Sequence, residues 1–372
     1  MPEAPDGHSL SHILLRFPHP EPPRPARTAA ILPVFLPFAG CPQRCIFCDQ
    51  SAQTGRAPEP LESVHARLQA ELGQPGPPVE VAFYGGTFTA LPNSWPERFV
   101  ALAGSHQPGG NAASGRVTRI RCSTRPDAVD AERLARLKAL GLSLVELGVQ
   151  SFDDAALLAS RRGYGGATAL AACETVRAAG LGLGIQLMPG LPGHTREAFR
   201  SDVAQAAALR PELARLYPCL VLAGTPLAEL WRAGAHVPWG LAETVDALAS
   251  ALLVLWAAGV PAARVGLAEQ EGLEILAGPR HPALGQMARG RALLLHVAGM
   301  LAAVPEPARV PDMVPGIVPG IFPDMVPGLV LDIPRRLQGE ALGQKNALAG
   351  EYAALGLAVR FWDGPDLVLR AQ

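Results

Sequence analysis

The sequence predicts an α/β fold in which short strands and longer helices alternate along most of the chain. Six apolar segments read as strands, and the segments between them carry apolar residues at helical spacing. Glycine closes several of the helical segments, as it often does at helix C-termini. Because strands that alternate with helices form βαβ units, a parallel sheet is expected.

The predicted strands, each bounded by turn-forming residues, are 31–38, 79–86, 117–124, 143–151, 181–189 and 213–222. The predicted helices between them are 61–73, 131–141, 167–180 and 195–209. Right-handed crossovers place the carboxyl ends of parallel strands on one rim of the sheet. The polar motifs that follow these strands are therefore expected to lie close together.

Composition and length limit what kind of protein this is. With 372 residues, 49% of them hydrophobic, the chain has room for one large domain and an appendage. It has no uninterrupted apolar run long enough for a membrane span, and residues 1–29 read as a flexible Pro-rich leader rather than a secretion signal. A reducing, cytoplasmic location is expected, and a net charge of −1 excludes a global attraction to nucleic acid.

Three cysteines follow the first predicted strand, in the stretch Cys41-Pro-Gln-Arg-Cys45-Ile-Phe-Cys48. Their odd number and tight spacing favour a metal over a disulfide. Structural zinc normally takes four ligands, and no fourth Cys or His follows at finger spacing. A [4Fe–4S] cluster held by three thiolates leaves one iron open, where S-adenosylmethionine (SAM) can bind through its amino and carboxylate groups. A structural zinc or a redox-active cysteine cluster is the alternative.

The C-x3-C-x2-C spacing, with Phe47 before the third cysteine, resembles the signature of the radical SAM enzymes. The ordered motifs CPQRCIFC, FYGGTFT, STRPD, VELGVQS, RRGY and MPGLPG resemble the radical SAM core of the Elongator catalytic-subunit family over about residues 31–290. The resemblance implies a partial (β/α)6 TIM-like radical SAM barrel with a small α+β C-terminal appendage. Members active in transfer-RNA (tRNA) carboxymethylation carry a C-terminal acetyltransferase domain. The 72 residues after residue 300 are too few for that domain, so the chain is expected to resemble bacterial relatives without it.

The resemblance also implies an activity. A [4Fe–4S] cluster on Cys41, Cys45 and Cys48 would cleave SAM to a 5′-deoxyadenosyl radical, with an electron donor of the flavodoxin or ferredoxin type. The family's radical SAM domain acts in modification of the wobble uridine of tRNA, which makes tRNA the expected substrate. Two alternatives are radical SAM oxidation of a small molecule such as a porphyrinogen, and a non-enzymatic RNA-binding or scaffold protein with a relic cluster site. Neither a membrane nor DNA is expected as a partner.

The resemblance assigns cofactor contacts to the predicted rim. Gly85 and Gly86 match a Gly-Gly pair whose backbone meets the SAM amine, because glycine permits close approach, although an ordinary turn is the alternative. Arg125 could grip a carboxylate, unless its segment only caps the next helix through Asp127. Glu146 is expected to contact the ligand or to pair with a barrel arginine. The full set expected to bind SAM is Phe47, Gly85, Gly86, Thr87, Ser123, Arg125, Glu146, Gln150 and Gln186. No catalytic side chain is assigned.

The rest of the chain is divided into a core at 30–300, a Pro/Gly tetrapeptide-repeat insertion at 301–329 and a small cap at 330–372. Proline recurs every fourth residue within the insertion, which forbids a helix and favours turns, and we assign it no function. The cap reads as strand, helix and strand. Its Gly343-Gln-Lys-Asn346 only faintly resembles a nucleic-acid-binding GxxG loop, so a structural cap is preferred.

Two further features bear on partners and reactivity. Arg116, Arg119 and Arg121 could supply a small basic patch for tRNA, with an ordinary solvated surface as the alternative. Cys219 lies within the last predicted strand, near the end that is expected to reach the rim. It is therefore the cysteine outside the motif that is most worth testing for reactivity.

Overall fold

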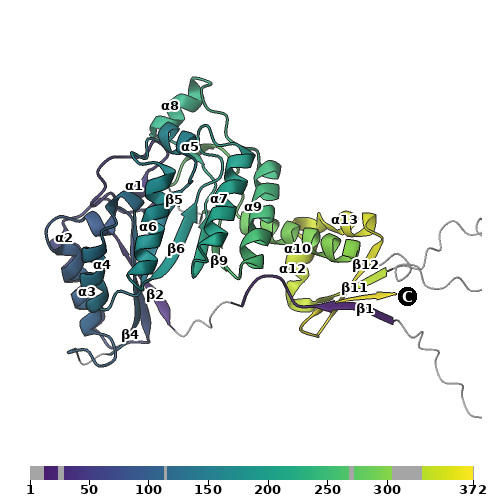
Figure 1. Ribbon diagram of the computed structural model, residues 1–372, viewed down its shortest axis with the longest axis horizontal. Coiled ribbons are helices and arrows are strands. Elements are labelled where there is room, and N and C mark those ends of the chain that lie inside the picture. The colour runs from purple at the N-terminus through teal and green to yellow at the C-terminus, as the bar shows by residue number, and fades with distance from the viewer. Residues whose placement is uncertain (1–11, 24–28, 113–114, 268–271, 304–328, 372) are drawn as a thin grey trace, which may run out of the picture. The chain divides into compact units, whose positions relative to one another are not determined.

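The computed structural model describes residues 12–23, 29–112, 115–267, 272–303 and 329–371 (Figure 1). The chain separates into two compact units, of which the larger comprises residues 23–282 and the smaller combines residues 1–22 with 283–372. Most of the expected insertion, residues 304–328, lies outside the described residues. None of the helices described is long and apolar enough to cross a bilayer.

The larger unit is built on a curled sheet of seven parallel strands in the order β2-β3-β4-β5-β6-β7-β9. The strands are β2 (Ala30–Phe35), β3 (Val79–Tyr84), β4 (Val117–Thr124), β5 (Leu144–Gln150), β6 (Gly182–Leu187), β7 (Leu213–Leu216) and β9 (Ala262–Val265). The predicted α/β partial barrel is confirmed, and each predicted strand segment overlaps one of these strands. The strand β9 was not predicted, because its four residues include Arg264 and form no recognisable apolar run.

The last predicted strand, 213–222, is too long. In the structure β7 ends at Leu216, and β8 (Val221–Leu222) instead pairs antiparallel with β10 (Ile275–Ala277). Pro218 lies between β7 and β8. Proline has no backbone N–H to donate to a sheet, which is why the parallel pairing stops before it.

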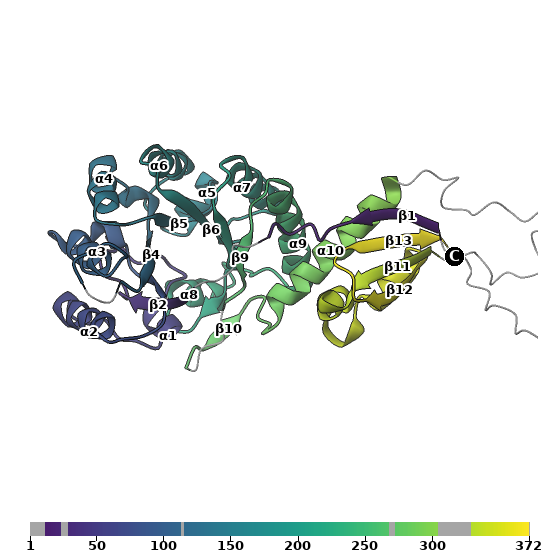
Figure 2. The same cartoon turned by 90° about the horizontal axis from the view of Figure 1, so that it is seen from below.

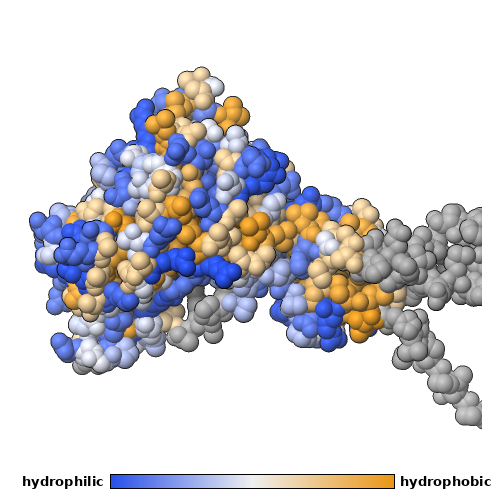
Figure 3. Space-filling model, in the orientation of Figure 1, coloured by the Kyte–Doolittle hydropathy of each residue, from blue (hydrophilic) through white to orange (hydrophobic). Residues whose placement is uncertain are grey.

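Helices cover one face of the seven-stranded sheet, as Figure 2 shows. They are α2 (Leu61–Gly73), α3 (Trp95–Ser105), α4 (Ala131–Ala139), α6 (Gly166–Ala178), α7 (Arg196–Ala208) and α9 (Leu241–Ala257), with the short helices α1 (Gln50–Thr54), α5 (Asp154–Ala159) and α8 (Pro226–Arg232) near the loops. The four predicted helices are confirmed, whereas α3 and α9 were not foreseen. Side-chain caps fix the starts of α4 and α7 among the longer helices, since Asp130 accepts from the N–H of Arg133 and Thr195 from that of Ala198. The surface mixes hydrophilic and hydrophobic residues (Figure 3).

The two faces of the sheet differ in chemistry, because neighbouring residues of a strand point to opposite sides. The face toward the helices is apolar and buried, and includes Val81, Phe83, Ile120, Val145, Leu147, Ile185 and Leu187. The opposite, concave face carries Glu80, Tyr84, Arg121, Ser123, Glu146, Gln186 and Arg215. Polar chemistry is therefore concentrated on the side of the sheet that the helices leave uncovered.

The smaller unit is a four-stranded sheet in the order β1-β13-β11-β12, packed with helices. Its elements are β1 (His12–Phe17), β11 (Leu329–Pro334), β12 (Leu357–Trp362), β13 (Leu367–Ala371), α10 (Leu284–Ala303), α12 (Gln338–Leu342) and α13 (Ala349–Ala354). Its core includes Phe17, Leu293, Leu331, Tyr352 and Leu367. This is the small α+β appendage that was predicted.

Two of the predicted boundaries are wrong. The segment 1–29 is not a leader throughout, because residues His12–Phe17 form β1 and pair antiparallel with β13. The core does not extend to residue 300, because α10 contributes Leu293 and Leu294 to the core of the smaller unit. Local sequence does not predict either boundary. The strand β1 is a single short apolar run whose partner lies at the other end of the chain, and the contacts of α10 are also with distant segments.

Asp332 is a buried carboxylate within the smaller unit, with 2% of its surface exposed. It accepts hydrogen bonds from Arg360 Nε at 2.7 Å and from Arg370 Nε at 2.6 Å. Burial alone would raise the pKa of Asp332, but these bonds lower it below the ordinary value of 3.8. The ionised carboxylate therefore stabilises the folded state above that value, and this stabilisation is lost as the pH falls through the lowered pKa.

We predict that Asp332→Asn lowers the free energy of unfolding of the smaller unit by about 2 kcal/mol at neutral pH, because charge-assisted hydrogen bonds are lost. Amide hydrogen exchange in β11 and β13 of the full chain measures this change, and the difference from the wild type should shrink in acid. Asp363→Asn is the control, since Asp363 is 87% exposed and pairs with Arg335 at the surface. It should change stability by less than about 0.5 kcal/mol. Equal losses in the two variants would contradict the prediction.

Candidate functional site

The three motif cysteines lie on the loop that joins β2 to α1, at the carboxyl end of a strand of the parallel sheet. The loop turns at Phe38 and Gly40, whose φ angles are 58° and 72°. Cys45 is buried, whereas Cys41 and Cys48 are partly exposed. A group bound by this loop would lie at the edge of the sheet where α/β folds place their ligands.

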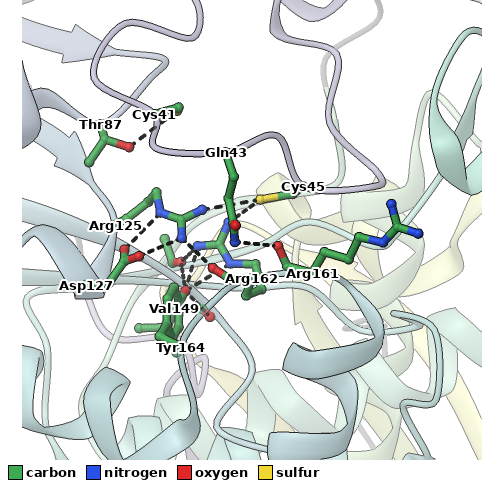
Figure 4. A network of polar contacts seen from close by, with 11 residues as sticks. Cys41, Gln43, Cys45, Thr87, Arg125, Asp127, Val149, Arg161, Arg162 and Tyr164 are labelled. Atoms are coloured by element: carbon green, nitrogen blue, oxygen red, sulfur yellow. Dashed lines mark hydrogen bonds and ion pairs between the residues drawn. The ribbon is translucent and has the colours of Figure 1, made fainter.

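Two guanidinium groups point at the sulfur of Cys45 (Figure 4). Arg162 Nη1 donates to Cys45 Sγ at 3.0 Å, and Arg125 Nη1 donates to it at 3.5 Å. Both arginines are 4% exposed. The middle cysteine of the motif therefore lies in a buried environment with two guanidinium groups beside its sulfur.

The fork of Arg125 is already occupied, which corrects the expectation that it grips a ligand carboxylate. Its Nε and Nη2 donate to the two carboxylate oxygens of Asp127 at 2.9 Å and 2.7 Å. The alternative, in which Asp127 caps the next helix, is also wrong, because Asp130 caps α4. Arg125 instead faces Cys45 and lies over the ring of Tyr164, 5.4 Å from its centroid.

Arg162 is a residue of this site that the sequence analysis did not single out, although it belongs to the RRGY motif. Its Nε donates to the hydroxyl of Tyr164 at 3.0 Å, and its Nη2 donates to the carbonyl of Gly148 at 2.6 Å. The Tyr164 hydroxyl in turn donates to the Gly148 carbonyl at 3.0 Å. These contacts hold the guanidinium in one orientation, with its remaining nitrogen toward Cys45. The only local signal is a tyrosine two residues after an arginine.

Thr87 contacts the first cysteine of the motif. Its hydroxyl oxygen lies 3.3 Å from Cys41 Sγ, and its N–H donates to the carbonyl of Ala39 at 2.7 Å. Burial raises the pKa of the Cys41 thiol, and the bond to Thr87 partly offsets this effect. Burial also raises the pKa of Cys48 to about 12. A metal bound here must therefore displace thiol protons.

Gly86 packs against the cysteine loop, which gives its lack of a side chain a reason besides the close approach of a ligand that the sequence predicts. A Cβ on Gly86 would lie 2.1 Å from the carbonyl oxygen of Ala39 and 2.7 Å from that of Leu36. Its N–H donates to Gln50 Oε1 at 2.7 Å, and the same oxygen accepts from the N–H of Phe38. The Gly-Gly turn and Gln50 thus hold the loop in place, and Gln50 is a second residue that sequence reasoning missed.

Glu146 pairs with arginines on the concave face. Of its two predicted roles, ligand contact and pairing with a barrel arginine, the structure shows the pairing. Its carboxylate forms an ion pair with Arg215 and another with Arg121, in which Nη1 and Oε1 are 3.3 Å apart. The hydroxyl of Tyr84 accepts hydrogen bonds from both arginines. Arg121 also lies 3.0 Å from Glu80. The floor of the half-barrel is therefore a connected charged network.

The tRNA patch suggested for three arginines near β4 is wrong. Arg121 is 5% exposed and belongs to the network around Glu146. Arg116 is 8% exposed and donates to the carbonyl of Glu71 at 2.9 Å, while Arg119 pairs with Glu212. Arg116 and Arg121 are buried, and the charge of the partly exposed Arg119 is balanced by Glu212, so the three do not form a free basic surface.

The remaining candidates lie in different surroundings. Gln150, at φ 68°, accepts from Gln186 Nε2 at 3.1 Å, so these two amides lie together. Ser123 is half-buried on the concave face, in register with Glu146. Phe47 is 6% exposed and packs in an apolar cluster that also contains Cys219. Burial raises the pKa of Cys219 to about 12, so the reactivity considered for its thiol is not favoured.

The donor set is consistent with an iron–sulfur cluster. Three thiols lie on one loop, and cations lie beside one of them. Within the described ranges, no three His, Cys, Asp or Glu side chains converge on a single metal position. A cubane cluster needs a different arrangement, because each of its thiolate ligands binds a different iron.

Comparison with protein families finds two matches that follow one another along the chain. The model of the Radical SAM superfamily matches residues 35–206. The model of the Radical SAM C-terminal domain matches residues 211–293. The first match includes all three motif cysteines, Thr87, Arg125 and Arg162, and the second begins just before β7.

Among curated proteins, the chain is 26% identical over 281 residues to the tRNA uridine(34) acetyltransferase of Methanocaldococcus infernus, covering 65% of this chain and 53% of the relative. It is 29% identical over 303 residues to Elongator complex protein 3 of Schizosaccharomyces pombe, covering 68% and 54%. The chain therefore spans about half the length of these relatives. The solved structure of the archaeal M. infernus Elp3 matches with a TM-score of 0.50 and 22% identity, covering 70% of this chain and 62% of that one, and shows the same fold.

We predict that Gly86→Ala lowers the free energy of unfolding of the larger unit by about 1–3 kcal/mol, because the added Cβ displaces the backbone of the cysteine loop. Urea unfolding followed by tryptophan fluorescence measures this loss. Gly73→Ala is the matched control, since a Cβ there meets nothing within 4 Å. Its effect should stay within about 0.5 kcal/mol. If Gly86→Ala were as stable as Gly73→Ala, the contact with the loop would have no energetic weight.

Proposed function

Because the chain belongs to the radical SAM superfamily, we propose that it is an enzyme that holds a [4Fe–4S] cluster on Cys41, Cys45 and Cys48, binds SAM and modifies a tRNA. One observation carries the cofactor part of this proposal. Two buried arginines donate to the sulfur of the middle cysteine, on a loop at the carboxyl end of a barrel strand. A protein gains from burying such cations when an anionic group binds beside them.

The chain's own residues prepare the site in three ways. Thr87 orients Cys41, while Gln50 and Gly86 fix the turn that precedes the motif. Arg125 and Arg162 supply positive charge at Cys45. Phe47, Leu227 and neighbouring apolar residues pack behind the loop and exclude water from that side. When bound, the cluster and SAM supply the reductive cleavage that yields a 5′-deoxyadenosyl radical.

SAM is proposed to lie between the cysteine loop and the concave face. Ser123, Gln150 and Gln186 present polar atoms on that side of the sheet. Thr87, Gly85 and Gly86 border it from the turn after β3, and the Arg125–Asp127 and Glu146–Arg215 pairs present polar groups that bound ligand atoms could approach. An external electron donor of the flavodoxin or ferredoxin class completes the proposed reaction.

The tRNA part of the proposal rests on relatives. The curated proteins to which the chain is similar include a tRNA uridine(34) acetyltransferase and Elongator complex protein 3. A tRNA-modifying role places the proposed reaction in the cytoplasm. Acetyl transfer is not part of the proposal, because the matched family models concern the radical SAM segments alone. With a net charge of −1, the chain should hold tRNA weakly and in a salt-sensitive way.

We predict that the anaerobically reconstituted chain binds about four irons and four sulfides, and that Cys45→Ala loses them. Iron and sulfide analysis with visible absorption measures the loading. Cys219→Ala is the matched control, because Cys219 is a buried cysteine of the same apolar cluster and should be dispensable for the cluster. Stoichiometric zinc in protein expressed anaerobically with excess iron would contradict the assignment.

We predict that the loaded enzyme, incubated anaerobically with SAM, dithionite and tRNA, forms 5′-deoxyadenosine and a modified nucleoside. Mass spectrometry of both products measures the reaction, with Cys45→Ala as the inactive control. Added salt should lower the tRNA-dependent yield as phosphate contacts weaken. Formation of 5′-deoxyadenosine that requires a small molecule and ignores tRNA would replace tRNA by the small-molecule alternative.

A further inference from the structure

Arg162 is a buried cation whose hydrogen-bond partners are a tyrosine hydroxyl, a backbone carbonyl and a cysteine sulfur. Its guanidinium donates to the Tyr164 hydroxyl, to the Gly148 carbonyl and to Cys45 Sγ. No carboxylate forms an ion pair with it among the residues that the structure describes. Arg125 beside it differs, because Asp127 neutralises its charge through two hydrogen bonds.

A buried charge without a counter-charge is costly, so this arrangement needs an explanation. Arginine cannot lose its proton within the ordinary pH range. Among the partners of Arg162, the sulfur of Cys45, at 3.0 Å, is the one that the proposed function makes a ligand of an anionic group. The charge of Arg162 is thus available to whatever anionic group that sulfur ligates, while the charge of Arg125 is largely balanced already.

We propose that Arg162 is a positioning residue that raises the reduction potential of the cluster ligated by Cys45, an inference that rests on the proposed function. Hydrogen bonds to ligand sulfurs and nearby charge are established determinants of iron–sulfur potentials. The reduction adds one electron to the cluster, with no bond made or broken and no proton assigned. The added negative charge is stabilised by a fixed guanidinium that is screened from water.

A redox titration of the reconstituted full chain without SAM tests this proposal. Dithionite supplies the electrons through mediators, and the paramagnetic signal of the reduced cluster reports the midpoint. In Arg162→Gln, the equilibrium constant for one-electron reduction should fall about tenfold, which is a midpoint about 59 mV lower for a one-electron couple. Arg162→Lys retains the charge and should shift the constant by less than about threefold.

Arg161→Gln is the matched control, because Arg161 is adjacent but exposed, and only its backbone carbonyl contacts the motif, through Gln43. Its charge is screened by solvent, so the midpoint should stay at the wild-type value. An unchanged midpoint in Arg162→Gln would overturn the proposal and leave Arg162 with a structural role only.

The outcomes separate this inference from the proposed function. A wild-type chain that binds no iron–sulfur cluster by iron and sulfide analysis overturns the proposed function, and this inference with it. A loaded wild type with no shift in Arg162→Gln overturns this inference alone. The midpoint does not depend on the fraction loaded, so partial loading of a variant still gives an answer. If Arg162→Gln binds no cluster, Arg162→Lys decides, and a fall of about tenfold or more there would overturn the proposal.

Discussion

The close contact between Gly86 and the loop after β2 is the constraint on which the candidate site depends. The loop backbone at Leu36 and Ala39 occupies the space where any side chain on Gly86 would lie. Gln50 then joins the two segments, by accepting from the N–H groups of Phe38 and Gly86. The cysteines are thus placed by backbone packing between consecutive strand ends, and hydrogen bonds fix what sterics allow.

Arginine has a structural meaning here that its abundance did not reveal. The chain has only two lysines, Lys138 and Lys345, and its other cations are arginines. Buried or half-buried arginines form the ion pairs of the concave face and the contacts at Cys45. The exposed Arg360 and the half-buried Arg370 pair with the buried Asp332. Arg121, Arg162 and Arg215 each use several donors of one guanidinium in different directions. A lysine keeps the charge but does not reproduce these donor directions.

The sequence was informative where a signal is local. Alternating strands and helices predicted the sheet, and the spacing of Cys41, Cys45 and Cys48 identified the loop. It was uninformative where partners come from distant segments. Arg162 and Gln50 have no distinguishing neighbours, because their roles depend on contacts with Cys45 and Gly86. The sequence predicts that Gly86 lets a ligand approach closely, but it does not show that Gly86 also lies against the backbone of Leu36 and Ala39. Arg125 was predicted to offer its guanidinium donors to a ligand. A sequence does not show that the carboxylate of Asp127, two residues later, accepts hydrogen bonds from two of them.

The pairing of β1 with β13 has a consequence for how the chain folds during synthesis. It brings His12 into register with Ala371, so the two pairing segments are separated by the whole larger unit. The larger unit can form its parallel sheet before residue 371 leaves the ribosome. The four-stranded sheet cannot add β1 until then, because β1 pairs with β13. The early strand β1 must wait for β13, which is made last, and pairing over so great a sequence separation is slow. Until it occurs, β13 presents an unpaired edge, which is the surface through which strands of different chains associate.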